Sequence, residues 1–252
     1  MSAPGLEWSI LAPALAAGAL VLSTHVPLGR QVLQRGIIFI DLAIAQFAAL
    51  GVIVAALMGW DNSPLATQAA AASAALAGAL TMTWTERRWP WIQEAIIGAA
   101  FVTAASLSLL LLAGNPQAGE HLQDILAGQI LWISWPDLLP ALLLYMPLLG
   151  LWFGFGERLG RIGFYLLFAA AVTVSVQLVG IYLVFASLIL PALATRGLKS
   201  AYLVGAAGYA SGLLASGGLD LPAGPAIVCA LALCALLCAL LLRPHADVTG
   251  DG

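Results

Sequence analysis

The chain has 252 residues, of which 62% are hydrophobic and only 8% are charged, and its mean hydropathy is +1.00. A soluble domain carries roughly 25% charged residues, so this composition excludes a soluble globule and predicts an integral membrane protein. The net charge is -3 and the nine Lys and Arg residues are scattered, which excludes a basic surface for nucleic acid. The amino terminus has no basic residue before its apolar run, so we expect a retained helix rather than a cleaved signal peptide.

A helix needs about 20 apolar residues to cross the hydrocarbon core of a bilayer. Runs of this kind, bounded by Gly, Pro and charged residues, predict an all-α polytopic bundle in which residues 1–252 form a single transmembrane domain. The nine predicted spans are 8–26, 36–58, 64–84, 95–113, 137–155, 162–178, 180–195, 201–217 and 223–242. The apolar stretch around Gly180 is divided into two spans at that residue.

The basic residues support this division, because Lys and Arg concentrate in cytoplasmic loops. With the amino terminus outside, all of them fall on the cytoplasmic side, and the carboxyl terminus is cytoplasmic as well. They are Arg30, Arg35, Arg87, Arg88, Arg158, Arg161, Arg196, Lys199 and Arg243. A single span over 162–195 would place the later ones outside.

Two polar residues fall inside the second span, where ionisable groups mark candidate functional sites. Asp41 lies near its cytoplasmic end and is either an ion ligand or an interfacial carboxylate capped by Arg30 or Arg35. Gln46 lies deeper and is either part of an ion path or a hydrogen-bonding link between helices. Five residues separate the two, about 140° around a regular helix, so a regular helix does not place them on one face.

A second candidate site lies in a predicted outer loop, where Glu120, His121 and Asp124 place three metal-binding side chains within five residues. His121 and Asp124 are one turn apart if this loop is helical, which suits metal capture. A solvated surface helix explains the same pattern.

The remaining titratable residues are expected to have structural roles or to be exposed. Glu94 is expected to favour the start of the fourth span through the helix dipole. His25 and His245 are expected to be exposed to solvent. Cys229, Cys234 and Cys238 lack metal-ligand spacing and are expected to be buried free thiols.

Motifs of soluble enzymes are absent from the sequence, including the zinc-protease His-Glu-x-x-His and the phosphate-binding Gly-x-x-x-x-Gly-Lys-Ser/Thr. We therefore predict a transport subunit rather than an enzyme, with any ATP hydrolysis carried out by a separate chain.

A resemblance to a known family rests on three segments of the chain. They are VLQRGIIFIDLAIAQFAALG (32–51), HLQDILAGQILWISWPDL (121–138) and VSVQLVGIYLVFASLILPALATR (174–196). In order and spacing they resemble the permeases of the zinc/manganese/iron ABC importer family. The resemblance covers roughly residues 10–242 and implies a bundle like that of the large, type II importers.

The resemblance implies that Asp41 is the intramembrane carboxylate of the ion path, which family members pair with a His. Counting back from Gly51 places Gln46 at the His position, with one extra residue after Asp41. A single-turn π-bulge would return Gln46 to the face of Asp41. The carboxylate and imidazole of the family suit zinc or manganese as the transported ion, whereas the neutral amide of Gln46 would bind zinc poorly. No permanently bound cofactor is expected.

The resemblance also implies partners: a cytoplasmic ABC ATPase, an external metal-binding protein and a second permease, in a homodimer or heterodimer. It places the chain in the inner membrane of a bacterial cell. The cytoplasmic helix that inserts into the ATPase in family members is shortened here to 154–163. Glu157, Arg158 and Arg161 are predicted to form a docking elbow there, or else a plain cytoplasmic loop.

Other functions remain open at this stage. A siderophore or cobalamin ABC permease would share the large-importer architecture. A secondary carrier driven by protons or sodium would use Asp41 as its coupling site and would transport without an ATPase. A scaffold or membrane enzyme would show no flux.

Overall fold

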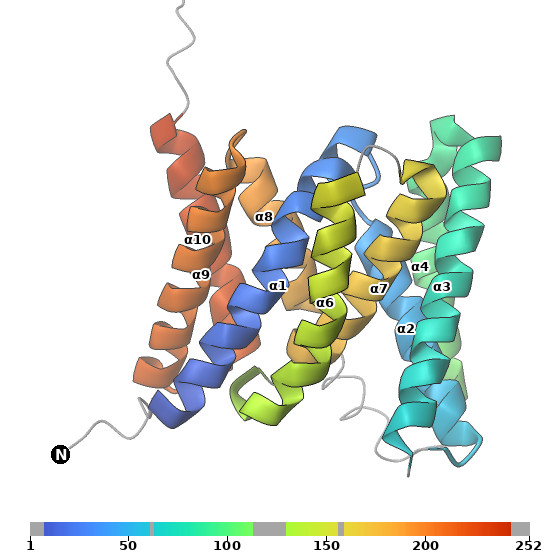
Figure 1. The fold of residues 1–252 in the computed structure, drawn as a ribbon, viewed down its shortest axis with the longest axis horizontal. Helices are drawn as coiled ribbons and strands as arrows, with labels where there is room; N and C mark the ends of the chain where they lie inside the picture. Colours follow the sequence, from blue (N-terminus) through green and yellow to red (C-terminus); the bar gives the residue numbers. More distant parts are fainter. Residues whose placement is uncertain (1–7, 61–62, 113–129, 156–158, 243–252) are drawn as a thin grey trace, which may run out of the picture.

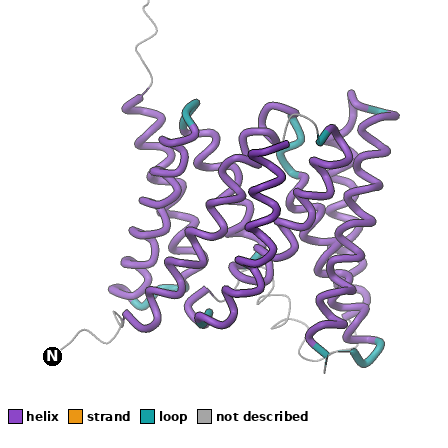
Figure 2. The backbone as a smooth tube through the Cα atoms, viewed as in Figure 1, coloured by secondary structure: helices purple, strands orange, loops and turns teal. Residues whose placement is uncertain are grey.

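The computed structural model describes residues 8–60, 63–112, 130–155 and 159–242, and within these ranges the chain is built of helices and short connections (Figures 1 and 2). The helices are α1 (Trp8–Arg35), α2 (Ile40–Leu57), α3 (Pro64–Arg88), α4 (Gln93–Leu112), α6 (Trp135–Phe155), α7 (Gly160–Val179), α8 (Ile181–Ala194), α9 (Leu198–Leu219) and α10 (Ala223–Leu242). Two 3₁₀ turns, η1 (Pro90–Ile92) and η2 (Ile130–Trp132), precede α4 and α6.

The predicted all-α architecture is confirmed, because each of the nine predicted apolar segments coincides with one of the nine α-helices in the described ranges. Six of these helices, α1, α2, α3, α6, α7 and α10, are long and apolar enough to cross a membrane. The chain is thus a multi-pass membrane protein. That the other three helices also cross the bilayer stays a prediction.

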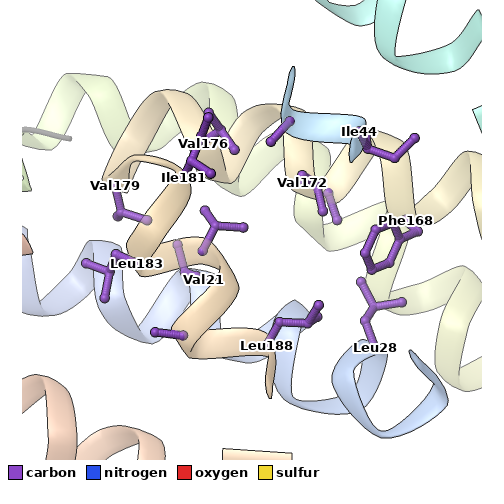
Figure 3. Close-up of a cluster of buried hydrophobic side chains, with 14 of the residues drawn as sticks. Val21, Leu28, Ile44, Phe168, Val172, Val176, Val179, Ile181, Leu183 and Leu188 are labelled. Carbon is purple, nitrogen blue, oxygen red and sulfur yellow. The ribbon is translucent and has the colours of Figure 1, made fainter. Parts of the chain in front are cut away.

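Helix α1 runs through the middle of the bundle and separates two groups of helices (Figure 1). It packs against α8 and α9 on one side and against α6 and α7 on the other. Helices α8, α9 and α10 form the first group, while α2 packs against α3 and α4 in the second. Branched and aromatic side chains of α1, α2, α7 and α8 meet in the core between the groups, including Val21, Ile44, Phe168 and Leu188 (Figure 3).

The first helix is longer than predicted, because it continues past Pro27 to Arg35 instead of ending at residue 26. It ends at Gly36, whose φ of 68° is the left-handed conformation that glycine tolerates best. The Ile37 N–H bonds to the Val32 carbonyl and the Gly36 N–H to the Leu33 carbonyl, both at 3.3 Å. This pair of bonds is the Schellman motif, so Gly36, and not Pro27, is the residue that stops the helix.

Pro27 remains inside α1 because a neighbouring helix satisfies the group that it leaves unpaired. A proline has no N–H, so the carbonyl four residues earlier, that of Ser23, loses its partner within the helix. The Tyr202 hydroxyl of α9 donates to this Ser23 carbonyl at 2.9 Å. In the interior of a bilayer, a backbone carbonyl that loses its partner within a helix needs such a donor from elsewhere in the protein.

The predicted break at Gly180 is present, and a single residue joins α7 to α8. Gly180 has φ 80° and ψ 163°, a combination that is open to glycine and closed to residues with a Cβ. Its N–H donates to the Val176 carbonyl and its carbonyl accepts from the Val184 N–H. Both backbone groups of this buried turn are therefore paired.

The surface has the character of a lipid-facing protein. Leucines of α6 and α10, including Leu143, Leu240 and Leu241, are largely exposed, which a soluble monomer rarely tolerates over whole helices. The tryptophans lie at or within about a turn of the helix ends, the pattern of aromatic side chains at the two membrane interfaces. They are Trp8, Trp60, Trp84, Trp89, Trp91, Trp132, Trp135 and Trp152.

Glycines bring α9 and α10 into close contact. A Cβ on Gly208 would fall on Leu231, and one on Gly212 would fall on the backbone of Ile227. The small-xxx-small pattern of Gly208 and Gly212 therefore serves packing within the bundle, as such patterns commonly do in membrane helices.

We predict that Tyr202→Phe destabilises the protein by about 1 kcal/mol, because the Ser23 carbonyl would lose its donor. Thermal unfolding of the purified protein in detergent measures the effect. In a Pro27→Ala background, where the substitution restores the missing backbone N–H, the loss of the Tyr202 hydroxyl should cost much less. Equal costs in the two backgrounds would contradict this role, and Tyr182→Phe at an exposed position of α8 is the control.

We predict opposite effects of Gly→Ala at two positions of α9. Gly212→Ala should lower the unfolding temperature in detergent, because the added methyl group meets the α10 backbone. Gly218→Ala faces open space and should be neutral or stabilising, by up to about 1 kcal/mol, through its better helix propensity. If Gly212→Ala proved as stable as Gly218→Ala, the close approach of the two helices would be disproved.

Candidate functional site

The candidate site is the buried start of α2, which the Schellman turn at Gly36 directs back into the bundle. Phe39 occupies the N-cap position, and its side chain makes no capping hydrogen bond. The first two residues of the helix, Ile40 and Asp41, are both buried. The N-cap residue Phe39 is itself 45% exposed, so this helix end is buried only on the side of Ile40 and Asp41. Its free N–H groups create a positive potential there.

Asp41 is the most unusual group in this region. Its side chain is only 1% exposed, and both carboxylate oxygens lack a hydrogen-bond partner among the described residues. The N–H groups of Asp41 itself and of Leu42 lie near the carboxylate, but neither reaches hydrogen-bond geometry. The expected cap from Arg35 is not formed, because that guanidinium lies 4.2 Å from the centre of the Phe164 ring.

Glu94 approaches the same helix end from α4. The Phe39 N–H donates to its Oε1 at 3.2 Å, so Glu94 caps α2 across 55 residues of sequence. Its other oxygen, Oε2, is buried and has no partner among the described residues. The sequence-based interpretation of Glu94 as a carboxylate that favours its own helix start missed this contact, because only the packing of α2 on α4 creates it.

The predicted π-bulge between Asp41 and Gln46 is wrong. Helix α2 is regular from Ile40 to Leu57, so the two side chains point about 140° apart. Gln46, 4% exposed, instead lines a largely apolar groove of about 810 Å³ together with Phe101, Tyr182 and Cys229. This groove lies between α2 and α4 on one side and α8 and α10 on the other.

His25 was expected at the solvent-exposed end of a short first helix, and this expectation is wrong as well. Because α1 continues to Arg35, His25 lies ten residues before its end and is 0% exposed. Its Nδ1 lies 3.0 Å from the Val21 carbonyl and 3.0 Å from the Thr24 hydroxyl. Nε2 is buried and has no partner among the described residues.

Other hydroxyl groups lie buried in the middle of the bundle. The Tyr145 hydroxyl of α6 donates to the Ala171 carbonyl at 3.2 Å and forms a short contact with the Ser175 hydroxyl. The hydroxyls of Ser187 and Tyr209 are 2.8 Å apart. Since α6 is otherwise largely exposed, Tyr145 is the polar anchor that holds this helix to α7.

Several predicted residues lie elsewhere. Glu120, His121 and Asp124 of the outer loop, Glu157 and Arg158 of the docking elbow, and His245 of the tail lie outside the described residues. Arg161 is exposed in the first turn of α7, and at most four residues separate the end of α6 from the start of that helix.

The expectation that the cysteines are buried is wrong. Cys229 is exposed, and Cys234 and Cys238 are partly exposed, although all three are free thiols as predicted. They lie on α10, much of whose apolar surface faces outward, and Cys229 lines the groove that also contains Gln46.

Comparison with known proteins places this bundle in a class. The sequence matches the ABC 3 transport family over residues 7–159 and 147–242. No curated protein matches the sequence at a significant level. The fold is similar to PsaBC from Streptococcus pneumoniae in complex with Fab, with a TM-score of 0.67 and 21% identity over 91% of this chain and 90% of that one. It also resembles a transporter described as of the metal-chelate ABC type, in an inward-facing conformation, with a TM-score of 0.51 and 16% identity over 96% and 81% of the two chains.

These findings define a polytopic ABC transporter permease, a transport component rather than an ATPase. The chain belongs to the ABC 3 transport family, as its three sequence segments predicted. Its fold is that of the type II importer permeases, as predicted.

Proposed function

We propose that the chain imports a divalent transition metal, zinc or manganese, and that Asp41 lines the ion path. The observation that carries this proposal is the Asp41 carboxylate, which is buried inside a membrane helix without a hydrogen-bond partner among the described residues. An ionisable group in such a place is costly to fold, and a passing cation would give it a partner. Family membership favours an ATP-driven permease over a proton-coupled carrier.

Transport would proceed by alternating access. An external metal-binding protein delivers the ion to the outer mouth, where Glu120, His121 and Asp124 are candidates for the first contact. ATP-driven closure of separate ATPase subunits then opens the path toward Asp41 and the cytoplasm. Two permease copies are expected to form the pathway, in a homodimer or heterodimer, and the groove that contains Gln46 is a candidate for its wall.

The charge distribution supports an orientation with the amino terminus outside and the carboxyl terminus in the cytoplasm of a bacterial cell. The described Lys and Arg residues lie at the ends of α1 and α3, at the start of α7, and in the connection from α8 into the first turn of α9. These helix ends lie together at one end of the bundle, opposite the start of α1 (Figure 1). The end with the basic residues would face the cytoplasm.

The same end offers a place for the ATPase. Arg161 is exposed at the start of α7, next to the short connection that contains Glu157 and Arg158. We expect these three residues to form a compact docking elbow in place of a longer coupling helix.

We predict that Asp41→Asn abolishes metal accumulation by cells that express the complete transporter, while the protein still inserts and assembles. The substitution keeps the size of the side chain and removes the charge that binds the cation. Uptake of radioactive manganese and zinc measures the result, with Asp220→Asn as a control because Asp220 is exposed and Asn tolerates its left-handed conformation. Undiminished uptake by Asp41→Asn would refute the proposed role.

We predict that Arg161→Glu weakens copurification of the ATPase, because it reverses the charge of the docking elbow. The matched control is Arg196→Glu, which reverses an equally exposed charge in the connection between α8 and α9. Equal retention of the ATPase by the two variants would count against the elbow.

A further inference from the structure

Two carboxylates meet at the buried start of α2, although they belong to different helices. Glu94 Oε1 accepts from the Phe39 N–H, and Asp41 follows Phe39 by two residues, within the first turn of the same helix. The hydrogen bond to Phe39 therefore brings Glu94 to the turn of α2 that carries Asp41. The packing of α2 against α4 therefore holds together two groups of like charge.

Three carboxylate oxygens at this point have no partner. Asp41 Oδ1, Asp41 Oδ2 and Glu94 Oε2 are all buried, and none accepts a hydrogen bond from the described residues. The positive end of the α2 dipole offsets part of the charge, but it amounts to only about half an elementary charge. Arg35, the basic side chain nearest in sequence to Asp41, lies instead on the Phe164 ring.

The three oxygens match the requirements of a divalent cation in transit. A buried carboxylate and a half-buried one with no counter-ion among the described residues are unfavourable, and a doubly charged ion would neutralise both. In the described ranges no set of three His, Cys, Asp or Glu side chains is grouped for metal binding, so a cation here would keep water or take ligands from outside this set. Such partial coordination suits an ion that must be released.

The donor chemistry also bears on which ion is carried. Carboxylate oxygens are hard ligands that suit manganese, whereas zinc is favoured by imidazole and thiolate. Gln46, at the position where the resemblance places a His, faces a groove on another side of α2. His25 bonds within α1 through Nδ1 alone, and its buried Nε2 has no partner among the described residues.

We infer that Glu94 is a second ligand of the transported ion, which shares the cation with Asp41 and makes the site prefer manganese over zinc. Oε1 holds the start of α2 in place, and Oε2 contributes to the ion site. This inference rests on the proposed function, because it assumes that the ion passes Asp41.

The test compares two substitutions of Glu94 that separate capping from charge. Glu94→Gln keeps a side-chain oxygen that can accept from the Phe39 N–H and removes the charge, whereas Glu94→Ala removes both. Glu86→Gln is the matched control, because Glu86 is likewise half-buried and has one buried oxygen without a partner among the described residues. It lies on α3, near Tyr165 of α7.

Two measurements are made on each variant. Manganese binding to the purified full-length permease is followed by electron paramagnetic resonance with Mn²⁺ alone. Uptake of radioactive manganese and zinc is followed in cells that express the complete transporter. We expect Glu94→Gln to unfold near the wild-type temperature, to bind Mn²⁺ at least about tenfold more weakly and to lower the ratio of manganese to zinc uptake. Glu86→Gln should match the wild type in both measurements.

The outcomes separate this inference from the proposed function. If Glu94→Gln binds and transports like the wild type while Glu94→Ala unfolds at a lower temperature, Glu94 is only a cap and the inference is overturned. Loss of uptake in Asp41→Asn would then leave the proposed function standing. If Asp41→Asn also transports normally, both fail.

Discussion

The need to pair every backbone polar group inside a bilayer governs this structure. With no water to accept or donate hydrogen bonds, each interruption of a helix must be repaired by the protein itself. Pro27 leaves the Ser23 carbonyl unpaired, and Tyr202 of a distant helix supplies the donor. Gly180 interrupts the helical conformation between α7 and α8, and the adjoining helical turns pair both of its backbone groups. The buried start of α2 receives its acceptor from Glu94.

The candidate ion site follows from the same constraint. A helix that begins beside the bundle core presents free N–H groups there, and a carboxylate from another helix is an efficient acceptor for them. Because Glu94 caps α2, its charge lies at the same first turn as the buried Asp41. The repair of the backbone thus brings together the two negative charges that give the region its affinity for a cation.

The sequence predicted the helices and Asp41, but not the surroundings of that residue. The apolar runs and the glycines between them define the spans well, because a span is determined by the length and composition of its own segment. The end of α1 was misplaced because a proline usually stops a helix, and whether it does here depends on Tyr202, which follows Ser23 by 179 residues. Placing His25 at an exposed helix end followed from the same error. Glu94 was not linked to Asp41 because their proximity depends on how α2 packs against α4, and the spacing of Asp41 and Gln46 suggested a bulge that the regular helix does not contain.

The one-residue turn at Gly180 has a consequence for how the protein enters the membrane. The 14 residues of α8 extend about 21 Å, less than the roughly 30 Å of the hydrocarbon core, so this helix cannot be inserted as a separate crossing. Helix α7, with 20 residues, is long enough to cross alone, so α8 is the shorter return arm of a hairpin whose two outer ends lie on the same side. We therefore expect α8 to depend on α7 for its place in the membrane, because the shorter helix has no span of its own without its partner.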